Sequence, residues 1–203
     1  MLDTPRTGPG GARERILDTA YRLFSSRGIR DVGINEIIAT SGVAKATLYQ
    51  HFRTKNELVL AFLERREARW TFALVDAQSR ARGETPEQQL LAIFDVFDDL
   101  FSDSAHFDGC SFINVLLEMG PESVPGRACI THLETIRGVL RKRAQRAGLD
   151  DPEGFARSWH ILMKGSIIAA VEGDADAARR AQGMARTLLE QHRGGRDEIP
   201  PGP

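Results

Sequence analysis

Side chains suited to reading DNA are gathered in one short segment, residues 42–55. Thr47 can present a hydroxyl and a methyl group to a base edge, and the small Ala46 beside it lets the backbone come close to the bases. Four further side chains can hydrogen-bond to phosphate groups or neutralise them: Tyr49, His51, Arg53 and Lys55. Leu48 and Phe52, four residues apart, would hold the opposite side of a short helix against the protein. The segment therefore predicts a helix that turns a polar face towards duplex DNA.

Two helices are predicted before this segment. In residues 13–27 the apolar side chains, beginning at Ile16, recur with a helical period. Gly28 is suited to end that helix, because a glycine at positive φ carries no Cβ penalty. A second short helix at residues 34–40 has three isoleucines for its buried side, and residues 41–42 turn the chain into the third helix. Two short helices joined by a tight turn that contains glycine are the helix-turn-helix pattern.

This region resembles the DNA-binding domain of the TetR family of transcriptional regulators. The matching residues are Arg15, Phe24, Gly28, Ile37, Gly42, Val43, Lys45, Thr47, Leu48, Tyr49, His51, Phe52, Lys55 and Leu58. The resemblance implies that four of them face DNA: Thr47, Tyr49, His51 and Lys55. The full set of candidate DNA-binding residues is Thr40, Lys45, Ala46, Thr47, Tyr49, Gln50, His51 and Lys55.

The chain departs from the family pattern at three helix positions. Gly33 and Ala44 stand where the family usually has a Ser or Thr helix cap, and Ala46 stands where Gly is common. Glycine at an N-cap costs only a few tenths of a kcal/mol, whereas alanine costs about 1 kcal/mol. The alternative interpretation of the segment is an amphipathic helix whose charged side chains are only solvated, with Tyr49 a partly buried ring.

The distribution of charge supports a nucleic-acid partner better than the total does. The whole chain has 27 Lys and Arg residues against 28 Asp and Glu residues. Residues 1–55 contain nine basic and five acidic side chains, which leaves 18 basic and 23 acidic ones for the rest. A basic N-terminal region on an acidic remainder lets one part of the protein meet phosphates while the other stays away from DNA.

Helical periodicity continues through the remainder and predicts an all-α fold. Further helices are expected at residues 55–82, 90–101, 108–119, 127–147, 150–172 and 174–192. The run Arg141, Lys142 and Arg143 is interpreted as a solvated helix C-terminus, favoured by the helix dipole, with a second DNA contact as the alternative. The domains expected are a flexible tail at 1–11, a three-helix helix-turn-helix domain at 12–57, a helical ligand-binding and dimerisation domain at 58–192, and a flexible tail at 193–203.

The last two predicted helices carry more apolar surface than one solvent-facing layer needs. Small residues among the large ones allow close approach of helices, and such a pair suits a four-helix bundle formed with a second copy of the chain. The candidate dimerisation residues are Ile168, Val171, Ala181, Met184 and Leu188. The TetR resemblance implies the same homodimer. The alternative is that both helices bury these faces within the monomer.

An aromatic and sulfur-containing set could line a pocket for a small, apolar or aromatic effector. Its members are Phe94, Phe97, Phe101, Cys110, Phe112, Trp159 and Met163. A plain hydrophobic core explains the same residues equally well. No cluster of charges is expected beside these aromatics. Cys110 lies near a helix start, which favours a thiolate and hence a redox or electrophile sensor, and a small buried hydrophobe is the alternative.

Several other classes of protein are not indicated by the sequence. It contains no catalytic or nucleotide-binding motif, so no catalytic residue, metal ligand or cofactor is assigned. Cys110 and Cys129 lack the spacing of a zinc site. The chain has no apolar run long enough for a membrane span and no signal peptide is predicted, so a cytoplasmic location with reduced thiols is expected.

Two functions from different classes remain. The first is a homodimeric, ligand-responsive regulator of transcription that binds double-stranded DNA, and a repressor released from a palindromic operator is expected. The second is an enzyme or small-molecule carrier that retains a helix-turn-helix head. Binding to duplex DNA that weakens with salt separates them, because only the first requires phosphate neutralisation.

Overall fold

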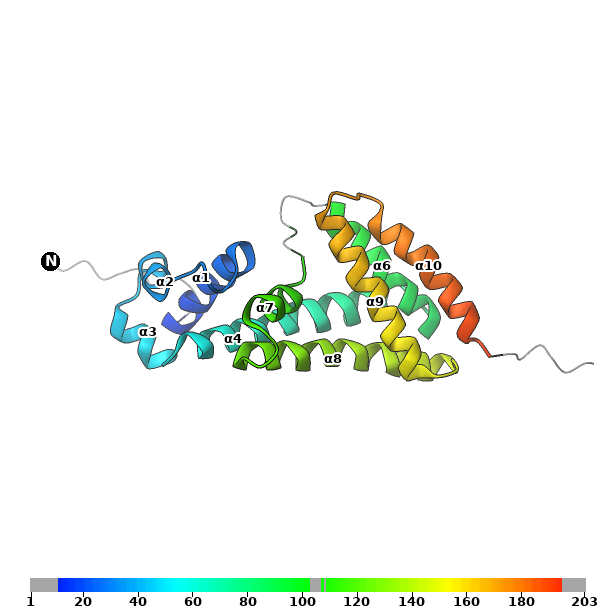
Figure 1. Ribbon diagram of the computed structural model, residues 1–203, viewed down its shortest axis with the longest axis horizontal. Helices are drawn as coiled ribbons and strands as arrows, with labels where there is room; N and C mark the ends of the chain where they lie inside the picture. The colour runs from blue at the N-terminus through cyan, green and yellow to red at the C-terminus, as the bar shows by residue number, and fades with distance from the viewer. Residues whose placement is uncertain (1–10, 103–106, 108, 195–203) are drawn as a thin grey trace, which may run out of the picture. The chain divides into compact units, whose positions relative to one another are not determined.

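The computed structural model describes residues 11–102, 107 and 109–194, and in this part of the chain every regular element is a helix (Figure 1). The elements in order are α1 (Ala12–Arg27), α2 (Ile34–Ser41), α3 (Lys45–His51), α4 (Lys55–Glu67), the π-helix η1 (Ala68–Gln78), α5 (Ser79–Ala81), α6 (Pro86–Ser102), α7 (Ser111–Met119), α8 (Val124–Ala147), α9 (Pro152–Val171) and α10 (Ala177–His192). The predicted all-α fold is confirmed. The tails predicted at 1–11 and 193–203 lie almost wholly outside the described residues.

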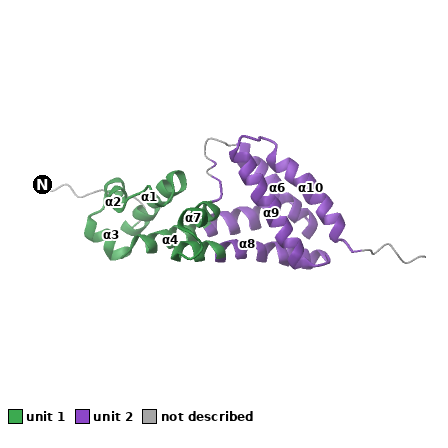
Figure 2. Ribbon diagram, viewed as in Figure 1, with its two compact units in different colours: residues 1–66, 111–130 green, residues 67–110, 131–203 purple. Residues whose placement is uncertain are grey.

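The chain divides into two compact units (Figure 2). Unit 1 comprises residues 1–66 and 111–130, and unit 2 comprises residues 67–110 and 131–203. The chain passes between them at the junction of α4 with η1, ahead of α7, and within α8. The domain boundary at residue 57 stays a prediction. The structure groups α7 and the start of α8 with the N-terminal helices in unit 1.

Unit 1 is built on a core that the first three helices share. Ile16, Ile37 and Leu48, one from each of α1, α2 and α3, are all completely buried. Phe62 of α4 closes this core, and its ring meets the ring of Phe24 edge-on, with centroids 5.6 Å apart. Burying apolar side chains of this size is worth about 1.5–3 kcal/mol each, so tertiary packing holds the short helices in place.

The turn between α1 and α2 depends on a glycine and on a distant carboxylate. Gly28 ends α1 with φ of +83°, a conformation that L side chains rarely adopt. The backbone N–H of Ile29 donates to Glu118 Oε2 at 2.9 Å, and the N–H of Arg30 donates to the other carboxylate oxygen. A Cβ on Gly28 would come within 3.0 Å of Glu118 Oε2. The prediction that Gly28 ends the helix is confirmed, and the space beside it is filled by Glu118.

Unit 2 contains a bundle in which α10 packs against both α6 and α9. Its interior is aromatic: the rings of Phe94 and Trp159 lie 5.5 Å apart, and those of Phe155 and Trp159 lie 5.1 Å apart. All three side chains are at most 1% exposed. Offset and tilted aromatic pairs at these distances add about 0.5–1.5 kcal/mol each beyond the area that they bury.

The single helix predicted over residues 55–82 is helical throughout, but its middle third is not an α-helix. From Ala68 to Gln78 the backbone forms a π-helix, in which each N–H bonds one residue further back than in an α-helix. Trp70, Thr71 and Val75 of this segment are buried. π-Helical turns are rare and often mark functional sites, and the apolar periodicity of the sequence did not distinguish this one from an α-helix.

Arg143 of α8 binds groups at the C-terminal end of this π-helix. Its guanidinium donates to the carbonyl of Asp76 at 2.8 Å, to Ser79 Oγ at 2.7 Å and to the carbonyl of Gln89 at 2.8 Å. It also forms an ion pair with the Asp76 carboxylate at 2.9 Å. Arg143 is only 2% exposed, so the prediction of a solvated run is wrong for this residue. Carbonyl groups near the end of a buried helix need donors, and a planar guanidinium supplies several.

Candidate functional site

The third helix presents the face that the sequence predicted. Leu48 is completely buried and Phe52 is 3% exposed, which fixes α3 to unit 1. Most of the candidate DNA-binding side chains are exposed: Thr40, Lys45, Ala46, Tyr49, Gln50 and His51. Thr47 and Lys55 are half-buried, and Tyr49 is 41% exposed. The structure therefore leaves the whole set within reach of a ligand, with the two apolar anchors on the other side.

The N-caps of α2 and α3 are the two unusual residues noted in the sequence. Gly33 is the N-cap of α2 and Ala44 is the N-cap of α3, and neither helix has a side-chain hydrogen bond at its N-cap. Gly42, which ends α2, has φ of +65° in the left-handed region. The turn between the two helices therefore relies on backbone conformation and on the core below it.

A capping arrangement that sequence reasoning missed positions the start of α4. The N–H of Glu57 donates to Thr54 Oγ1 at 3.1 Å, and the Glu57 carboxylate accepts from the N–H of Arg53 at 2.8 Å. A Ser or Thr followed three residues later by Glu is the signal for such a cap, and Thr54 and Glu57 carry it in the sequence. These bonds fix the backbone that carries Arg53 and Lys55, two of the residues expected to meet phosphates.

In unit 2 ring contacts join four of the candidate effector residues into a buried aromatic cluster: Phe94, Phe97, Phe101 and Trp159. Phe94, Phe97, Phe101, Cys110, Trp159 and Met163 are at most 7% exposed. The remaining candidate, Phe112, is also buried but belongs to unit 1. The sequence missed Trp70, whose ring lies 5.6 Å from that of Phe97 and 6.4 Å from that of Phe107. A Trp inside the wide π-helix has no sequence signal that separates it from an ordinary core residue.

A buried histidine and a half-buried lysine follow Trp159 on α9, a helix that also contributes to the aromatic cluster. His160 is 3% exposed, and burial, together with the charges of Lys164 and Arg137, lowers its pKa to about 3. Burial also lowers the pKa of Lys164, as does Arg137, whereas Cys110 opposes the shift. Within the described residues Trp159 Nε1 and His160 Nδ1 are buried without a hydrogen-bond partner. The sequence analysis did not single out Lys164, because this residue follows His160 by one helical turn and is not part of a charge run.

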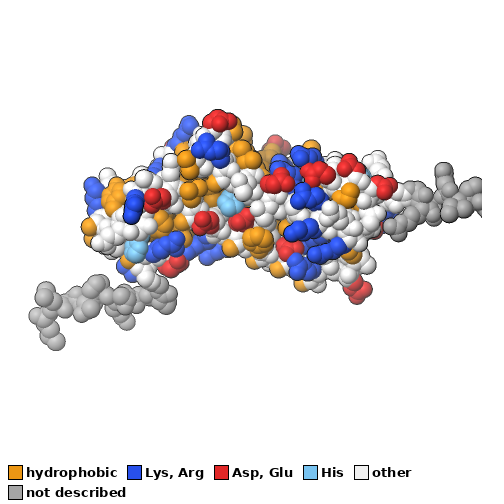
Figure 3. Space-filling view, turned by 90° about the horizontal axis from the view of Figure 1, so that it is seen from below, with side chains coloured by type: hydrophobic (Ala, Val, Ile, Leu, Met, Phe, Trp, Pro, Cys, Tyr) orange, Lys and Arg blue, Asp and Glu red, His pale blue; other side chains and the backbone are white. Residues whose placement is uncertain are grey.

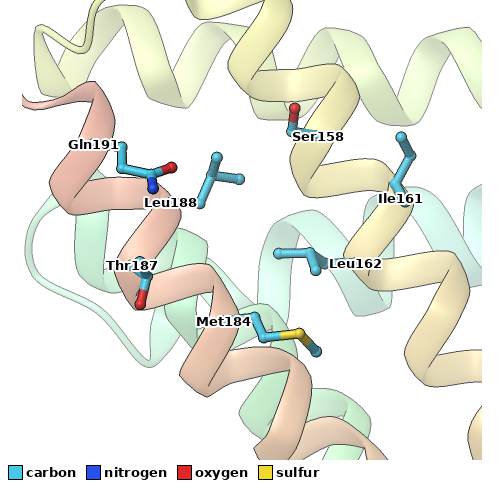
Figure 4. A pocket seen from close by; sticks show the side chains of 7 residues that line it. All are labelled: Ser158, Ile161, Leu162, Met184, Thr187, Leu188 and Gln191. Atoms are coloured by element: carbon cyan, nitrogen blue, oxygen red, sulfur yellow. The ribbon is translucent and has the colours of Figure 1, made fainter.

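The outer side of α9 and α10 carries exposed apolar side chains. Ile168 is 46%, Val171 59% and Met184 56% exposed. A groove of about 500 Å³ runs between the two helices and is lined by Ser158, Ile161 and Leu162 of α9 and by Met184, Thr187, Leu188 and Gln191 of α10 (Figure 4). Of the candidate dimerisation residues, Leu188 is half-buried, and Ala181 is 2% exposed because it packs inside unit 2.

Elsewhere the surface is mixed in charge, and basic and acidic side chains lie intermingled on the face that Figure 3 shows. Some charged side chains of the described residues form ion pairs, such as that between Arg141 and Glu153 at 3.0 Å. Across the described ranges no group of three His, Cys, Asp or Glu side chains is placed to hold a metal ion. In the same ranges no helix combines the length and hydropathy needed to cross a membrane.

Comparison with known proteins points to one family. Residues 16–62 match the family described as "Bacterial regulatory proteins, tetR family". The HTH-type transcriptional regulator AcrR of Shigella flexneri is 22% identical over 193 residues, which cover 89% of this chain and 88% of AcrR. The HTH-type transcriptional repressor NemR of Escherichia coli is 27% identical over 66% of this chain and 65% of its own. A crystal structure of a TetR-family transcriptional regulator from Streptomyces coelicolor aligns with a TM-score of 0.81 and 29% identity, covering 90% of this chain and 96% of that one.

Proposed function

This chain belongs to the TetR family of bacterial regulatory proteins, and we propose that it is a homodimeric repressor of transcription that a small molecule releases from a palindromic operator. The observation that carries the proposal is the exposed polar face of α3 above its buried anchors Leu48 and Phe52. A helix held in this way can enter a major groove with its polar side chains against the bases and the flanking phosphates.

Within the interface the residues have different roles. Thr47 contacts a base edge, because its hydroxyl and methyl can both discriminate between bases. Tyr49, His51 and Lys55 contact phosphates, which set the position and register of the protein on the duplex. The Thr54 and Glu57 cap supports this second role, since it fixes the backbone from which Lys55 extends.

Assembly uses the outer face of α9 and α10. Ile168, Val171 and Met184 are large apolar side chains exposed on neighbouring helices, and the groove between α9 and α10, which Met184 lines, accepts side chains of a second copy. Two helices from each copy then form a four-helix bundle with two-fold symmetry. Such a dimer places two α3 helices on one side of the DNA, and successive major grooves require them to lie about 34–36 Å apart.

Release from DNA is driven by an effector that binds among the aromatic side chains of unit 2. The chain runs from the operator-reading helices into that unit through α4 and η1. A ligand that favours one conformation of this helix changes the separation of the two α3 helices and weakens DNA binding. By thermodynamic linkage, operator DNA must weaken ligand binding by the same factor. The names of AcrR, a transcriptional regulator, and NemR, a transcriptional repressor, support the role in transcription that this release would control.

The experiment is selection of genomic fragments by the purified full-length protein, followed by titration of the selected duplex at several salt concentrations. A regulator gives a linear fall of log affinity with log salt, since counterions are released from each neutralised phosphate. Lys55→Ala should reduce that slope, and Lys142→Ala, at an exposed lysine of α8, is the matched control. Selection of no fragment, with no salt-dependent binding of any duplex, would favour the enzyme or carrier instead.

A further inference from the structure

Unit 2 carries a half-buried charged group for which no ion pair is found among the described residues. Lys164 is half-buried on α9, one turn beyond the buried His160. No carboxylate within the described part of the chain lies at ion-pair distance from its ammonium group. Taking an ammonium out of water costs free energy unless an anion or several acceptors replace the lost hydration. A half-buried lysine without an anionic partner adds little to the stability of the fold, and its ammonium is available to an anion from outside the chain.

Arg137, whose charge acts on Lys164, is itself a cation and supplies no counter-charge. Arg137 of α8 already has a partner of its own, because its Nε donates to Glu134 at 2.8 Å. His160 stays neutral, for burial holds its pKa at about 3. The charge of Glu134 balances that of Arg137, and the neutral His160 contributes no charge. Lys164 is therefore the one uncompensated positive charge in the cluster of Lys164, His160 and Arg137.

Hydrogen-bonding groups beside Lys164 are also unused. His160 Nδ1 is buried without a partner among the described residues, and so is the indole N–H of Trp159 in the same turn of α9. Buried polar groups are nearly always hydrogen-bonded in folded proteins, so the open His160 and Trp159 nitrogens are available to a bound water or ligand. Trp159 itself belongs to the aromatic cluster through its ring contact with Phe94.

We propose that the effector of this protein is a monovalent carboxylate with an apolar body, held by the Lys164 ammonium and the His160 ring while its body lies among the aromatic side chains of unit 2. This inference rests on the proposed function and names the chemistry of its effector. One uncompensated positive charge matches one carboxylate, whereas a phosphate dianion would leave a negative charge buried. A carboxylate has two oxygens, so it can accept one hydrogen bond from each of the two side chains.

The test measures the affinity of full-length protein for matched compounds by calorimetry. Naphthoate and octanoate are each compared with the primary amide of the same carbon skeleton, which has the same shape but no charge. At least one carboxylate should bind about tenfold more tightly than its amide, as expected for a charge-assisted hydrogen bond. Equal affinity within both pairs would overturn the proposal, as would the absence of carboxylate binding below about 1 mM.

Variants then assign the preference to Lys164. Lys164→Met should weaken carboxylate binding about tenfold while amide affinity is unchanged, and Lys164→Arg, which keeps the charge, should retain the preference. Lys164→Gln serves if the methionine variant unfolds. Lys142→Met makes the same change at an exposed lysine and should alter neither affinity. A carboxylate preference that survives removal of the Lys164 charge would contradict the proposal.

DNA binding separates this proposal from the broader one. If an uncharged compound releases the selected duplex and the carboxylates have no advantage, the protein is a ligand-responsive regulator without an anion site. If the carboxylates bind through Lys164 but no duplex is bound, the anion site exists in a protein that does not regulate transcription.

Discussion

The carboxylate of Glu118 accepts a hydrogen bond at 2.9 Å from the backbone N–H of Ile29, 89 residues earlier in the chain. The adjacent N–H of Arg30 donates to the same carboxylate, so one side chain of α7 satisfies two consecutive amides in the turn that leads to α2. Backbone donors bonded to a charged acceptor form stronger hydrogen bonds than neutral pairs. α7 therefore helps to fix the first turn of the DNA-reading region.

Glu118→Gln should lower the free energy of unfolding by about 1–2 kcal/mol, because the neutral amide keeps one acceptor oxygen and loses both the second acceptor and the charge. Urea unfolding of the full-length protein measures the effect. Glu122→Gln makes the same change at an exposed glutamate just beyond α7 and should leave stability unchanged. Equal stability of the two variants would show that the carboxylate does not hold the turn.

Arg143→Met should destabilise the protein by about 3 kcal/mol or more. The substitution keeps a long side chain but removes the buried guanidinium that donates to the carbonyls of Asp76 and Gln89, and it leaves the Asp76 carboxylate with Arg80 alone. Denaturant unfolding is again the measurement. Lys142→Met, at the exposed neighbour, should stay within about 0.5 kcal/mol of the wild type, as surface substitutions usually do. A small loss for Arg143→Met would mean that water can replace the guanidinium at the end of η1.

Acid should weaken unit 2 through Asp76. Burial raises the pKa of this carboxyl, but hydrogen bonds and charge from Arg80 and Arg143 outweigh burial and hold the pKa below its ordinary value of 3.8. A carboxyl with a lowered pKa in the folded state stabilises the protein above its unfolded pKa, and that stability is lost as the pH falls through the folded pKa. Wild type should therefore lose stability below about pH 4, whereas Asp76→Asn, less stable at neutral pH, should change less.

The comparison uses urea unfolding from neutral pH down to about pH 3. Asp31→Asn, in the exposed turn before α2, is the control and should follow the wild-type profile. Parallel profiles for Asp76→Asn and wild type would assign the acid sensitivity to other groups.

At the DNA interface, Thr47→Ala and Lys55→Ala should have different effects. Loss of a base-edge contact relaxes the preference at one position of the operator and costs about 1–3 kcal/mol there. Loss of a phosphate contact weakens binding to all sequences alike and reduces the salt slope by about one. Binding-site selection and salt titration distinguish the two. The roles would have to be exchanged if Lys55→Ala altered the preferred bases and Thr47→Ala altered none.

Ile168→Arg should convert the protein from a dimer to a monomer in sedimentation experiments at micromolar concentration. The substitution places an unpaired charge in the proposed interface, at a cost of about 3–5 kcal/mol. Phe72→Arg is a matched control, because Phe72 of η1 is 48% exposed and Ile168 is 46% exposed. A wild type that sediments as a monomer would refute the assembly, and a dimer of Ile168→Arg would place the interface elsewhere.

The sequence predicted those features that depend on local periodicity. Leu48 and Phe52, spaced by one turn, identified the buried side of α3, and Gly28 marked the end of α1. Both follow from rules that involve only neighbouring residues. The same periodicity predicted the all-α fold, and it identified most members of the aromatic cluster in unit 2.

Features that depend on distant partners were not predicted. Arg143 lies in a run of basic residues that resembles a solvated helix end, and only the fold shows that it is buried with Asp76 and Gln89 as its partners. Glu118 gives no local sign that it binds the turn after α1. Lys164 was overlooked because its significance comes from the burial of its surroundings and from the lack of a counter-charge, neither of which a linear pattern contains.

Because Gly33 and Ala44 provide no capping side chain, α2 and α3 depend on the rest of unit 1 for their stability. α2 has eight residues and α3 has seven, and isolated helices of that length are marginal in water. Without caps of their own, both helices persist only while Ile37 and Leu48 are docked in the core of unit 1. The exposed face of α3 should therefore not be lost by local fraying: its amides should open to solvent together with the core beneath them, so that unit 1 presents this face either complete or not at all.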